Sequence, residues 1–471
     1  MELADFKQVY FLGIGGIGMS ALARWFNHAG YQVSGYDSTK TILTQQLEEE
    51  GIMVHYHDDV QQLQNRLPSE TLVVLTPAVP KTMQERVYLE THGFQILKRA
   101  QVLGAIANRY KGVAVAGTHG KTSISTMTAH IFRTSSFDCM AFLGGISKNY
   151  DTNLLLSSKT DYAVCEADEF DRSFLNLHPE LALISSVDAD HLDIYGTHQE
   201  MLKSFADFAS QATANLVCKF GILEQLEQVS DKLNAKNSKT SMFSYSLDNE
   251  QADFYAKNIQ LKNESYVFDL VHPSGCIENL QLNYPGLLNV ENIVGASALS
   301  LLAGIDQNDI RQAVSSYSGV QRRFDVRYRD EKLILIDDYA HHPTELHATI
   351  SSVRAMFPSR KITGVFQPHL YSRTKDFVDG FAKELSLVDE LLLLDIYPAR
   401  ELPIEGITSD LIKQLATVAD KRLLSREELE ADLMAREEGL ILMMGAGDIS
   451  LSIDKLASYF HERRNLCLKK S

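Results

Sequence analysis

Short apolar runs recur along most of the chain, and each is followed by a polar turn and a longer amphipathic segment. Such runs are typical of strands buried in parallel sheets, and the segments between them have the apolar period of helices, as in Met19–Ala29, which Gly30 ends. The predicted strands are Val9–Leu12, Tyr31–Tyr36, Leu72–Leu75, Val113–Ala116, Tyr162–Cys165, Leu181–Ser186, Lys332–Ile336, Ile362–Phe366, Leu391–Asp395 and Leu440–Met444. Strands that alternate with helices predict α/β domains with doubly wound parallel sheets.

One stretch departs from this pattern. From Thr240 to Tyr284, apolar and polar residues alternate with a period of two, and turn residues stand at Lys262–Glu264 and His272–Gly275. This alternation predicts antiparallel hairpins added to the edge of a sheet.

The chain has 471 residues, which is too many for one ordinary hydrophobic core. The spacing of strands and motifs predicts three domains, at residues 1–109, 110–321 and 322–471.

Charge and composition exclude several classes of protein. The formal net charge of −16 argues against a nucleic-acid partner, which needs a basic face. No apolar run is long enough to predict membrane insertion, and Met1–Lys7 lacks the features of a signal peptide. The cysteines are odd in number and show no metal-site spacing: Cys139, Cys165, Cys218, Cys276 and Cys467. We therefore expect free thiols in a reducing cytoplasm.

A glycine turn, Gly13–Gly18, follows the first strand and precedes a helix, and Asp37 ends the second strand. This is the dinucleotide-type pattern, in which glycines bring a diphosphate onto a helix N-terminus. NAD is the commonest ligand of such a turn, so the pattern leaves the ligand open, and a bare tight turn is the structural alternative. Thr76–Pro80 forms a rigid loop at the end of another strand, where α/β sheets bind ligands.

A second glycine turn, Gly117–Ser123, has the layout of a phosphate-binding loop. Backbone N–H groups would face the phosphates, Lys121 would reach the terminal phosphates, and the Thr122 hydroxyl would bind Mg²⁺. The match is incomplete, because Val115 stands where the usual motif has its first glycine.

Acidic residues and a histidine follow the next two strands. Glu166–Asp171 contains four acids, which suit Mg²⁺ because hard cations prefer carboxylate oxygens, although a solvated acidic loop is the alternative. His191 follows the strand after that, again among acids. Because the ends of parallel strands meet at one edge of a sheet, we expect Gly117–Thr122, Glu166 and His191 to lie side by side.

Two asparagines, Asn289 and Asn292, share a face of the helix that we expect from about Asn289 to Ala303. Such a pair can contact adenine, while an N-cap role is equally consistent for Asn289.

Polar clusters follow the strands of the third domain as well. They are Arg322–Asp325, Asp337–Glu345, Gln367–Thr374 and Gly445–Asp448. Pro343 suits the first turn of a helix that runs to about Met356, so His342–Glu345 is interpreted as a helix start.

These motifs, in this order and spacing, resemble the Mur ligase family over essentially the whole chain. They are most similar to the members that add L-alanine to UDP-N-acetylmuramate. Two positions depart from the family pattern: Leu370 stands where many members carry Arg, and the Thr76–Pro80 loop differs from a Ser-Ala-rich version.

The resemblance implies a cytoplasmic, ATP-dependent ligase of peptidoglycan precursor synthesis. The muramate carboxylate would attack the γ-phosphate of ATP, and the amine of L-alanine would then attack the acyl phosphate. The implied fold is an α/β three-domain architecture: a Rossmann-like N-terminal domain, a central P-loop ATPase-like domain with an antiparallel β extension, and a Rossmann-like C-terminal domain that closes the site. The implied ligands are UDP-N-acetylmuramate, L-alanine, ATP and two Mg²⁺ ions, with Mn²⁺ as a substitute, in a monomer or weak homodimer.

The resemblance also assigns residues. The UDP-sugar contacts would be Gly13, Gly15, Gly16, Ile17, Gly18, Asp37 and Thr76. The ATP contacts would be Gly117, Thr118, His119, Gly120, Lys121, Thr122, Ser123, Asn289, Asn292, Arg323 and Asp338, and the metal ligands Thr122, Glu166 and His191. The amino-acid contacts would be Tyr339, His341, His369 and Arg373, and the catalytic residues Lys121, Glu166, His191, His341 and Arg373.

Two of these assignments have a physical argument of their own. Arg373 follows a strand end, and a fixed arginine fork is the best group to hold the alanine carboxylate. His341 can position the ligand or ease proton loss from the amine, because the reference pKa of histidine lies near the working pH.

Three rival functions predict different behaviour. A nicotinamide-dependent oxidoreductase would explain Gly13–Gly18 and Asp37 but not Lys121. A nucleotide-gated switch protein would bind ATP without forming a covalent product. A family member that recycles a tripeptide onto the same UDP-sugar is the third rival, and the context Asp190–Tyr195 favours alanine addition over it.

Overall fold

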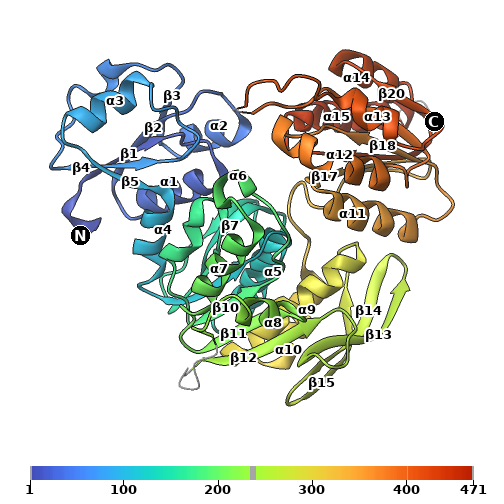
Figure 1. Cartoon of the computed structure of the whole chain (residues 1–471), viewed down its shortest axis with the longest axis horizontal. Coiled ribbons are helices and arrows are strands. Elements are labelled where there is room, and N and C mark those ends of the chain that lie inside the picture. The colour runs from blue at the N-terminus through green and yellow to red at the C-terminus, as the bar shows by residue number, and fades with distance from the viewer. Residues whose placement is uncertain (1–2, 234–239, 400, 469–471) are drawn as a thin grey trace. The chain divides into compact units, whose positions relative to one another are not determined.

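The computed structural model describes residues 3–233, 240–399 and 401–468, which form two compact units. The first unit contains most of the chain up to Ser318. The second contains the chain from Gly319 onward, together with the short segments Leu261–Tyr266 and Tyr284–Asn289. Figure 1 labels the elements of both units. Four cysteines are free thiols, and the side chain of Cys467 lies outside the described part.

The first sheet of the first unit has five parallel strands in the order β3-β2-β1-β4-β5. Its elements are η1 (Leu3–Asp5), β1 (Gln8–Leu12), α1 (Ile17–His28), β2 (Gln32–Tyr36), α2 (Ile42–Glu49), β3 (Met53–His55), η2 (Val60–Leu63), β4 (Thr71–Leu75), α3 (Gln84–Thr91), β5 (Gln95–Lys98) and α4 (Arg99–Ala107). Alternate residues of β1 enter different cores: Val9 and Phe11 join the core with α1 and α4, and Tyr10 and Leu12 the core with α3. This is the doubly wound arrangement that the apolar pattern predicts.

The second sheet has ten strands in the order β15-β14-β13-β12-β11-β10-β6-β9-β7-β8. Its elements are β6 (Lys111–Ala116), α5 (Lys121–Thr134), β7 (Met140–Ser147), β8 (Thr152–Leu155), β9 (Tyr162–Glu166), η3 (Phe170–Asn176), β10 (Leu181–Ile184), α6 (Leu192–Tyr195), α7 (His198–Ala209), β11 (Asn215–Lys219), α8 (Ile222–Glu227), β12 (Ser241–Ser246), β13 (Phe254–Lys262), β14 (Ser265–His272), β15 (Gly275–Leu282), α9 (Leu287–Ala303) and α10 (Gln307–Ser316). The parallel strands β10, β6 and β9 are neighbours, which confirms that their ends lie side by side.

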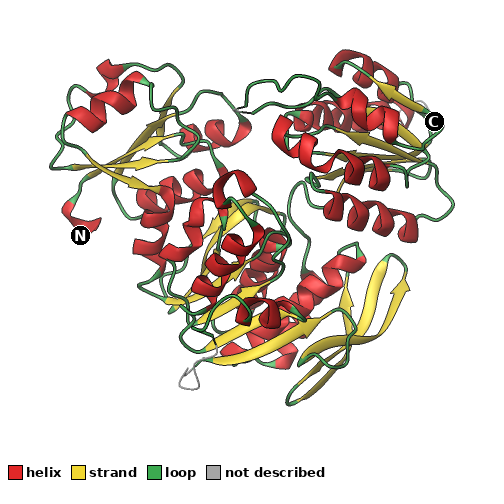
Figure 2. Ribbon diagram, viewed as in Figure 1, coloured by secondary structure: helices red, strands yellow, loops and turns green. Residues whose placement is uncertain are grey.

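The expectation of purely antiparallel hairpins between Thr240 and Tyr284 is wrong for β12. This strand pairs in parallel with both β11 and β13. It reaches its place beside β11 after the helix α8, and a crossover through a helix produces a parallel neighbour. The strands β13, β14 and β15 then extend the sheet to its edge (Figure 2).

The sheet of the second unit has the order β16-β17-β21-β18-β19-β20. Its elements are β16 (Asp325–Arg329), β17 (Leu333–Asp338), α11 (Pro343–Met356), β18 (Ile362–Phe366), α12 (Tyr371–Leu385), β19 (Glu390–Leu393), α13 (Ser409–Leu415), β20 (Lys421–Leu423), α14 (Arg426–Met434), β21 (Gly439–Met444) and α15 (Ile449–Leu468). Five strands are parallel, as predicted, and the edge strand β16 is antiparallel to β17 because a short turn connects the two.

Two helices begin earlier than the sequence predicts. The helix α1 begins at Ile17, directly on the glycine turn, and α9 begins at Leu287. Ile17 and Gly18 are therefore first-turn residues, whose N–H groups have no carbonyl partner within their own helix.

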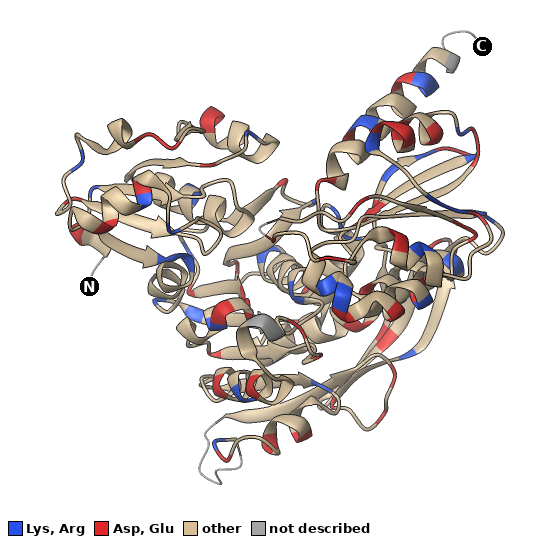
Figure 3. Cartoon of the chain, turned by 45° about the horizontal axis from the view of Figure 1, so that its top comes forward, with Lys and Arg blue, Asp and Glu red and all other residues tan. Residues whose placement is uncertain are grey.

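Charged residues of both signs are interspersed along the ribbon (Figure 3). Within the described ranges, no helix is both long enough and apolar enough to cross a membrane.

Candidate active site

The phosphate-type loop Gly117–Gly120 connects β6 to α5 and is tied to the end of β10. Thr118 N donates to Ser186 O at 3.1 Å, and His119 N donates to Ser186 Oγ at 2.7 Å. Gly117 and Gly120 have φ angles of +137° and +81°, and a Cβ on Gly117 would overlap the Ser185 hydroxyl. Glycine is required here because it tolerates positive φ angles and has no Cβ to overlap the neighbouring chain. The loop is therefore shaped by its own glycines and by two serines on a neighbouring strand end.

The Lys121 side chain turns back toward this loop and toward the acidic segment Glu166–Asp171. Its Nζ donates to Gly117 O at 2.6 Å and lies 2.7 Å from Glu169 Oε2, and the two side chains are only 14% and 2% exposed. Burial alone would lower the pKa of Lys121, but the carboxylates of Glu169, Asp168 and Glu166 outweigh it and raise that pKa. Lys121 is therefore a permanent cation held at the start of α5.

Glu166 ends β9 and lies against β7, where Gly144 leaves room for it. A Cβ on Gly144 would overlap the Glu166 carboxylate. The Oε2 atom of Glu166 is buried and has no hydrogen-bond partner within the described part of the chain. A buried carboxylate oxygen without a donor is costly unless a cation binds it.

His191 lies close to the same acids. Its Nε2 atom is 3.8 Å from Glu169 Oε1 and 3.7 Å from Asp190 Oδ2, and its backbone has a φ angle of +51°. Left-handed backbone at a residue other than glycine is strained and is often found at functional sites. The structure thus brings together Lys121 and His191, both of which contact Glu169.

The metal ligands Thr122, Glu166 and His191 remain predictions. Thr122 is a buried residue in the first turn of α5. In the described ranges, no group of three or more His, Cys, Asp or Glu residues could hold a metal ion by itself.

The two asparagines of α9 differ in their surroundings. Asn292 is buried, and its Oδ1 atom would lie 3.2 Å from a Cβ on Gly120, so it borders the phosphate-type loop. Asn289 lies in the first turn of α9, and its Nδ2 donates to Pro285 O at 2.5 Å. Because α9 begins at Leu287, Asn289 is not its N-cap.

The first glycine turn is assembled from the residues that the sequence predicts. A Cβ on Gly13 would lie 2.5 Å from Thr76 Cγ2, and Gly15 N donates to Asp37 Oδ2 at 2.8 Å. The other carboxylate oxygen of Asp37 accepts from Thr39 N at 3.1 Å. Asp37 therefore fixes the shape of the turn, a role that the sequence pattern does not reveal.

Arg99, the first residue of α4, lies beside this turn, and sequence reasoning misses it. Its Nη1 would lie 2.8 Å from a Cβ on Gly18, and its Nη2 donates to Asp168 Oδ2 at 2.9 Å. Its position directly after β5 could have identified it in the sequence, because the other candidate site residues also follow the ends of strands.

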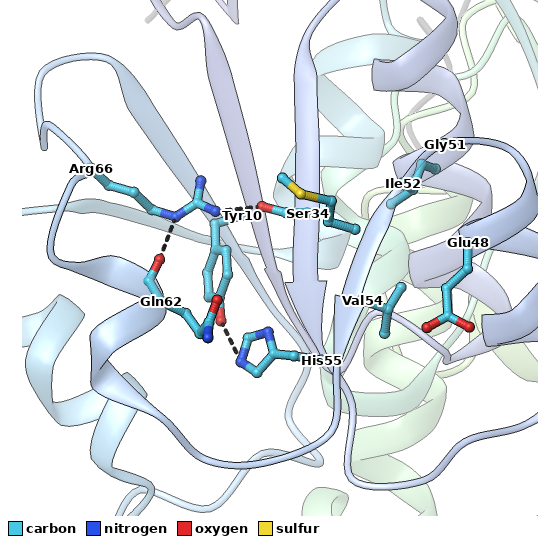
Figure 4. Close-up of a pocket in the computed structure, with 10 residues that line it drawn as sticks. Tyr10, Ser34, Glu48, Gly51, Ile52, Val54, His55, Gln62 and Arg66 are labelled. Atoms are coloured by element: carbon cyan, nitrogen blue, oxygen red, sulfur yellow. Dashed lines mark hydrogen bonds between the residues drawn. The ribbon is translucent and has the colours of Figure 1, made fainter.

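A separate pocket of about 600 Å³ lies over β1, β2 and β3. Figure 4 shows Arg66 beside Ser34 and Tyr10, and His55 pointing toward the Tyr10 hydroxyl. Arg66 donates to Ser34 Oγ at 2.7 Å, and buried Glu85 lies 2.7 Å from His55 Nε2. None of the predicted UDP-sugar contacts lines this pocket. Its polar groups satisfy one another, which is typical of a structural network.

In the second unit, four rings form a chain beyond the ends of β17, β18 and β19. The Tyr339 and His341 rings are 5.2 Å apart, the His341 and His369 rings 6.2 Å apart, and His369 stacks on Tyr397 at 5.7 Å. Arg323 Cζ lies 4.9 Å from the Tyr339 ring. The structure thus brings together three predicted amino-acid contacts, and it adds Tyr397, which follows β19 and which sequence reasoning misses.

His341 does not titrate near neutral pH, contrary to our expectation. Burial lowers its pKa to about 3, and the charge of Arg373 adds to this lowering. Its Nδ1 faces two acceptors, Tyr339 O at 2.9 Å and Glu345 Oε2 at 3.3 Å, so Nδ1 must carry the proton of the neutral ring. His341 is therefore a neutral imidazole whose Nε2 holds a lone pair.

Arg373 and Asp338 are both buried. Arg373 lies in the first turn of α12, whose N-terminus also favours anions. Asp338 accepts from Phe324 N at 2.7 Å and from Ala340 N at 2.8 Å. Burial raises the pKa of Asp338 despite these bonds and the nearby Arg323. Asp338 thus holds the segment Arg322–Asp325 in place, while its ATP contact stays a prediction.

Leu370 has a φ angle of +70° and precedes the first turn of α12. This strained conformation lies at the position where the resemblance leads us to expect Arg in many family members. Beside it, Glu401 accepts from Ser372 N at 2.9 Å.

Three family models match this chain. The Mur ligase family catalytic domain matches residues 8–111, the Mur ligase middle domain matches residues 115–300, and the Mur ligase glutamate ligase domain matches residues 322–447.

Individual relatives are similar over nearly the whole chain. The UDP-N-acetylmuramate–L-alanine ligase of Porphyromonas gingivalis is 46% identical over 458 residues, which are 96% of this chain and 99% of that protein. The crystal structure of a UDP-N-acetylmuramate–alanine ligase from Thermotoga maritima has a TM-score of 0.81 and 25% identity, covering 97% of this chain and 99% of that one. A murein peptide ligase from Psychrobacter arcticus has a TM-score of 0.69 at 21% identity, covering 96% and 98%, and shows a shared fold alone.

Proposed function

The chain belongs to the Mur ligase family, and on that premise we propose that it joins L-alanine to the carboxylate of UDP-N-acetylmuramate. It is an ATP-dependent ligase of peptidoglycan precursor synthesis. The observation that carries the proposal is the similarity to an alanine-adding ligase over both chains almost end to end. Recycling of a tripeptide is not favoured, because relatives that are 44–46% identical over nearly the whole chain are named as alanine-adding ligases. We expect the enzyme to act in the cytoplasm, as a monomer or weak homodimer.

The first glycine turn is the proposed site of the UDP-sugar. A diphosphate can accept hydrogen bonds from the N–H groups of Ile17 and Gly18, which begin α1. Thr76 packs against Gly13 and Asp37 braces Gly15, so the turn is already shaped for its ligand.

The loop Gly117–Ser123 is the proposed site of the ATP phosphates. Lys121 is a buried cation and would exchange contacts with Glu169 for contacts with the β- and γ-phosphates. Asn292, which borders Gly120, would contact the nucleotide, and we retain Asn289, Arg323 and Asp338 as further candidates.

The residues around Glu166 fit a hard divalent cation. Among the residues that the structure describes, no donor reaches one buried oxygen of Glu166, and Thr122 supplies a hydroxyl at the start of α5. We propose that Thr122 and Glu166 hold Mg²⁺ and that His191 helps to hold a second ion, with Mn²⁺ as a substitute. When bound, the cation neutralises the charge that develops on the transferred phosphoryl group.

The second unit supplies the proposed amino-acid site. Arg373 would hold the alanine carboxylate, and Tyr339 and His369 would border a pocket for its methyl group. The Nε2 lone pair of His341 would accept a hydrogen bond from the alanine ammonium and orient its proton loss. Because its pKa is low, His341 would position the amine rather than store its proton.

The reaction then proceeds in two steps. The muramate carboxylate oxygen attacks the γ-phosphorus of ATP, the bond to the β,γ-bridging oxygen breaks, and ADP leaves. The neutral amine of alanine attacks the carbonyl carbon, the amine loses a proton, and the tetrahedral intermediate collapses to the amide and inorganic phosphate. Lys121 and the N–H groups of its loop would stabilise the negative charge on the phosphoryl oxygens.

The product mass tests this proposal. The enzyme would be incubated with UDP-N-acetylmuramate, ATP, Mg²⁺ and a mixture of amino acids and a tripeptide. We expect one new product, the UDP-sugar plus a single alanine, with one ADP formed per product. A tripeptide adduct, another amino acid, or ADP without an adduct would contradict the proposal.

A further inference from the structure

Arg99 lies where the proposed diphosphate site meets the acidic segment, and no part of the reaction described above uses it. It is the first residue of α4, and its Nη1 lies so close to α1 that a Cβ on Gly18 would be only 2.8 Å away. Gly18 is the second residue of α1. Gly18, the last glycine of the turn, therefore makes room for a guanidinium at the helix N-terminus, where a diphosphate would bind.

The other side of the same guanidinium contacts the segment that carries the proposed metal and phosphate residues. Arg99 Nη2 donates to Asp168 Oδ2 at 2.9 Å, and the side chains are 21% and 33% exposed. Asp168 stands between Glu166, the proposed metal ligand, and Glu169, the partner of Lys121. One arginine thus links the two proposed phosphate sites of the first unit.

The helix that carries Arg99 is held tightly against η3, which begins within the acidic segment Glu166–Asp171. A Cβ on Gly104 of α4 would overlap the carbonyl oxygen of Asn176 at the end of η3. Asn108 Nδ2 also donates to Asn176 O at 2.9 Å, and His178 N donates to Asn108 Oδ1 at 2.9 Å. Because this contact holds α4 in place, the Arg99 side chain is held between Gly18 and Asp168.

We propose that Arg99 contacts the diphosphate of the bound UDP-sugar while it keeps its bond to Asp168. This inference rests on the proposed function. A guanidinium has five N–H donors in a planar fork, so it can serve two anions at once. Arg99 is then a diphosphate-binding residue that also positions the acidic segment, and UDP-sugar binding is coupled through Asp168 to the binding of nucleotide and metal.

The diphosphate contact is tested by comparing UDP with UMP, which lacks the second phosphate. We expect Arg99→Lys to weaken UDP binding about tenfold while UMP binding changes less than twofold, because a lysine cannot keep the planar fork toward both anions. Calorimetry on the full chain gives both affinities. Equal losses for UDP and UMP, or no loss, would overturn the contact.

The neighbouring residue provides a matched control. Lys98 Nζ lies 2.6 Å from Asp171 Oδ2, so this pair also joins the start of α4 to the acidic segment, but the lysine side chain is 59% exposed. We expect Lys98→Met to leave the UDP and UMP affinities unchanged. Lys98→Met could lower UDP binding as much as Arg99→Lys does. The loss of affinity would then come from the broken contact between α4 and the acidic segment, and not from a lost contact with the diphosphate.

The coupling is tested with a non-hydrolysable ATP analogue and Mg²⁺, titrated with and without UDP-N-acetylmuramate. We expect the sugar to strengthen analogue binding in the wild type, and Asp168→Asn and Arg99→Lys to reduce this ratio to within about twofold of one. An unchanged ratio in both variants, or no coupling in the wild type, would overturn the positioning role. These binding measurements do not depend on turnover, so an inactive wild type would count against the proposed function and not against Arg99.

Discussion

The first unit contains two glycine turns of the same plan that differ in where their positive charge comes from. Each turn follows the first strand of its sheet in the sequence and leads into a helix, at Gly13–Gly18 and Gly117–Gly120. The second turn carries a lysine, Lys121, at the first position of its helix. The first turn has no cation of its own, and Arg99 from α4 lies beside it instead.

The partners that brace the two turns differ in the same way. Asp37, a carboxylate, accepts the Gly15 N–H of the first turn, whereas the hydroxyl of Ser186 accepts the His119 N–H of the second. Phosphoryl transfer needs a cation at the terminal phosphate, while holding a diphosphate needs only donors around it. The glycines therefore define a shape, and the charged residues around them decide whether the bound phosphate reacts or only anchors the ligand.

Replacement of Lys121 should distinguish the functions of the two turns most clearly. We expect Lys121→Ala to lower kcat by about three orders of magnitude, because charge placement supplies most of the catalysis in phosphoryl transfer. UDP affinity should stay within about twofold, since Arg99 and the first turn are untouched. Steady-state kinetics and calorimetry measure these values, with Lys111→Ala, at the far end of β6, as the control. A variant that retains activity, or that loses UDP binding as well, would remove the distinction between the turns.

The metal proposal predicts the next largest effect. Glu166→Gln should lower kcat about a hundredfold and shift the Mg²⁺ titration to higher concentration, because an amide oxygen binds a hard cation more weakly than a carboxylate. Asp171→Asn, in the same acidic segment but paired with Lys98, should change neither value. A normal Mg²⁺ titration for Glu166→Gln would refute its role as a metal ligand.

A substitution in the first turn should give the opposite pattern to Lys121→Ala. A Cβ on Gly15 would lie 2.6 Å from Thr44 Cγ2 and 2.9 Å from Asp37 Oδ2, so the turn must shift. We expect Gly15→Ala to raise the KM for UDP-N-acetylmuramate by about tenfold to thirtyfold, while the affinity for an ATP analogue is unchanged. At Gly30, no described residue other than the chain neighbours comes within 4 Å of an added carbon, so Gly30→Ala tests the effect of a φ angle of +89° alone. An equal loss of affinity for the ATP analogue, measured without the UDP-sugar, would show that the substitution does not act on the first turn alone.

A substitution in the second unit should mainly affect the binding of L-alanine. Arg373→Lys should raise the KM for L-alanine about tenfold and leave those for ATP and UDP-N-acetylmuramate nearly unchanged, because a lysine cannot make the two parallel bonds of an arginine fork. Initial rates with each substrate varied in turn give the three values. If all three KM values move together, or none moves, the alanine carboxylate binds elsewhere.

The smallest predicted effect concerns stability. Burial raises the pKa of Asp337 in β17 to about 7, with Arg322 and Arg327 lowering it and Asp325 and Asp338 raising it further. Neither carboxylate oxygen has a hydrogen-bond partner among the described residues, and the nearest cations are Arg322 Nε at 3.6 Å and Arg327 Nη1 at 3.9 Å.

The folded pKa of Asp337 lies above the unfolded value of about 3.9, so the folded state binds a proton that the unfolded state lacks between about pH 4 and pH 7. The contribution of this residue to stability is therefore lost as the pH rises through that window. We expect Asp337→Asn to flatten the loss and to be about 2 kcal/mol more stable than the wild type at pH 8. Thermal unfolding from pH 5 to pH 8 measures this, and parallel curves for the two proteins would contradict it.

The sequence predicts the sheets well because buried parallel strands are short apolar runs with polar ends. The adjacency of Gly117–Thr122, Glu166 and His191 follows from that rule and from the strand order. The direction of β12 could not be predicted, since its alternating pattern suits a parallel or an antiparallel neighbour equally well. The early start of α1 is not visible in the sequence, because Ile17 and Gly18 are part of the glycine pattern of the turn.

Site residues can be predicted from the sequence when they belong to a motif. They cannot be predicted when folding brings them to the site from another part of the chain. Arg99 and Tyr397 come from other strand ends, and only the packing against Gly18 and His369 reveals them. The state of His341 was also beyond the sequence, because burial and the neighbouring Arg373 lower its pKa. A reference pKa describes a solvated side chain, and the cost of removing it from water appears only in the fold.

The central claim is that the ligand held by the first turn presents its carboxylate to the phosphate held by the second. The most direct measurement is the fate of ¹⁸O in UDP-N-acetylmuramate labelled in its carboxylate. When the enzyme turns over with ATP and L-alanine, we expect each inorganic phosphate to carry one oxygen from that carboxylate, because the acyl phosphate forms through it and releases it when the amine attacks. Phosphate without the label, formed in step with the alanine product, would contradict the claim.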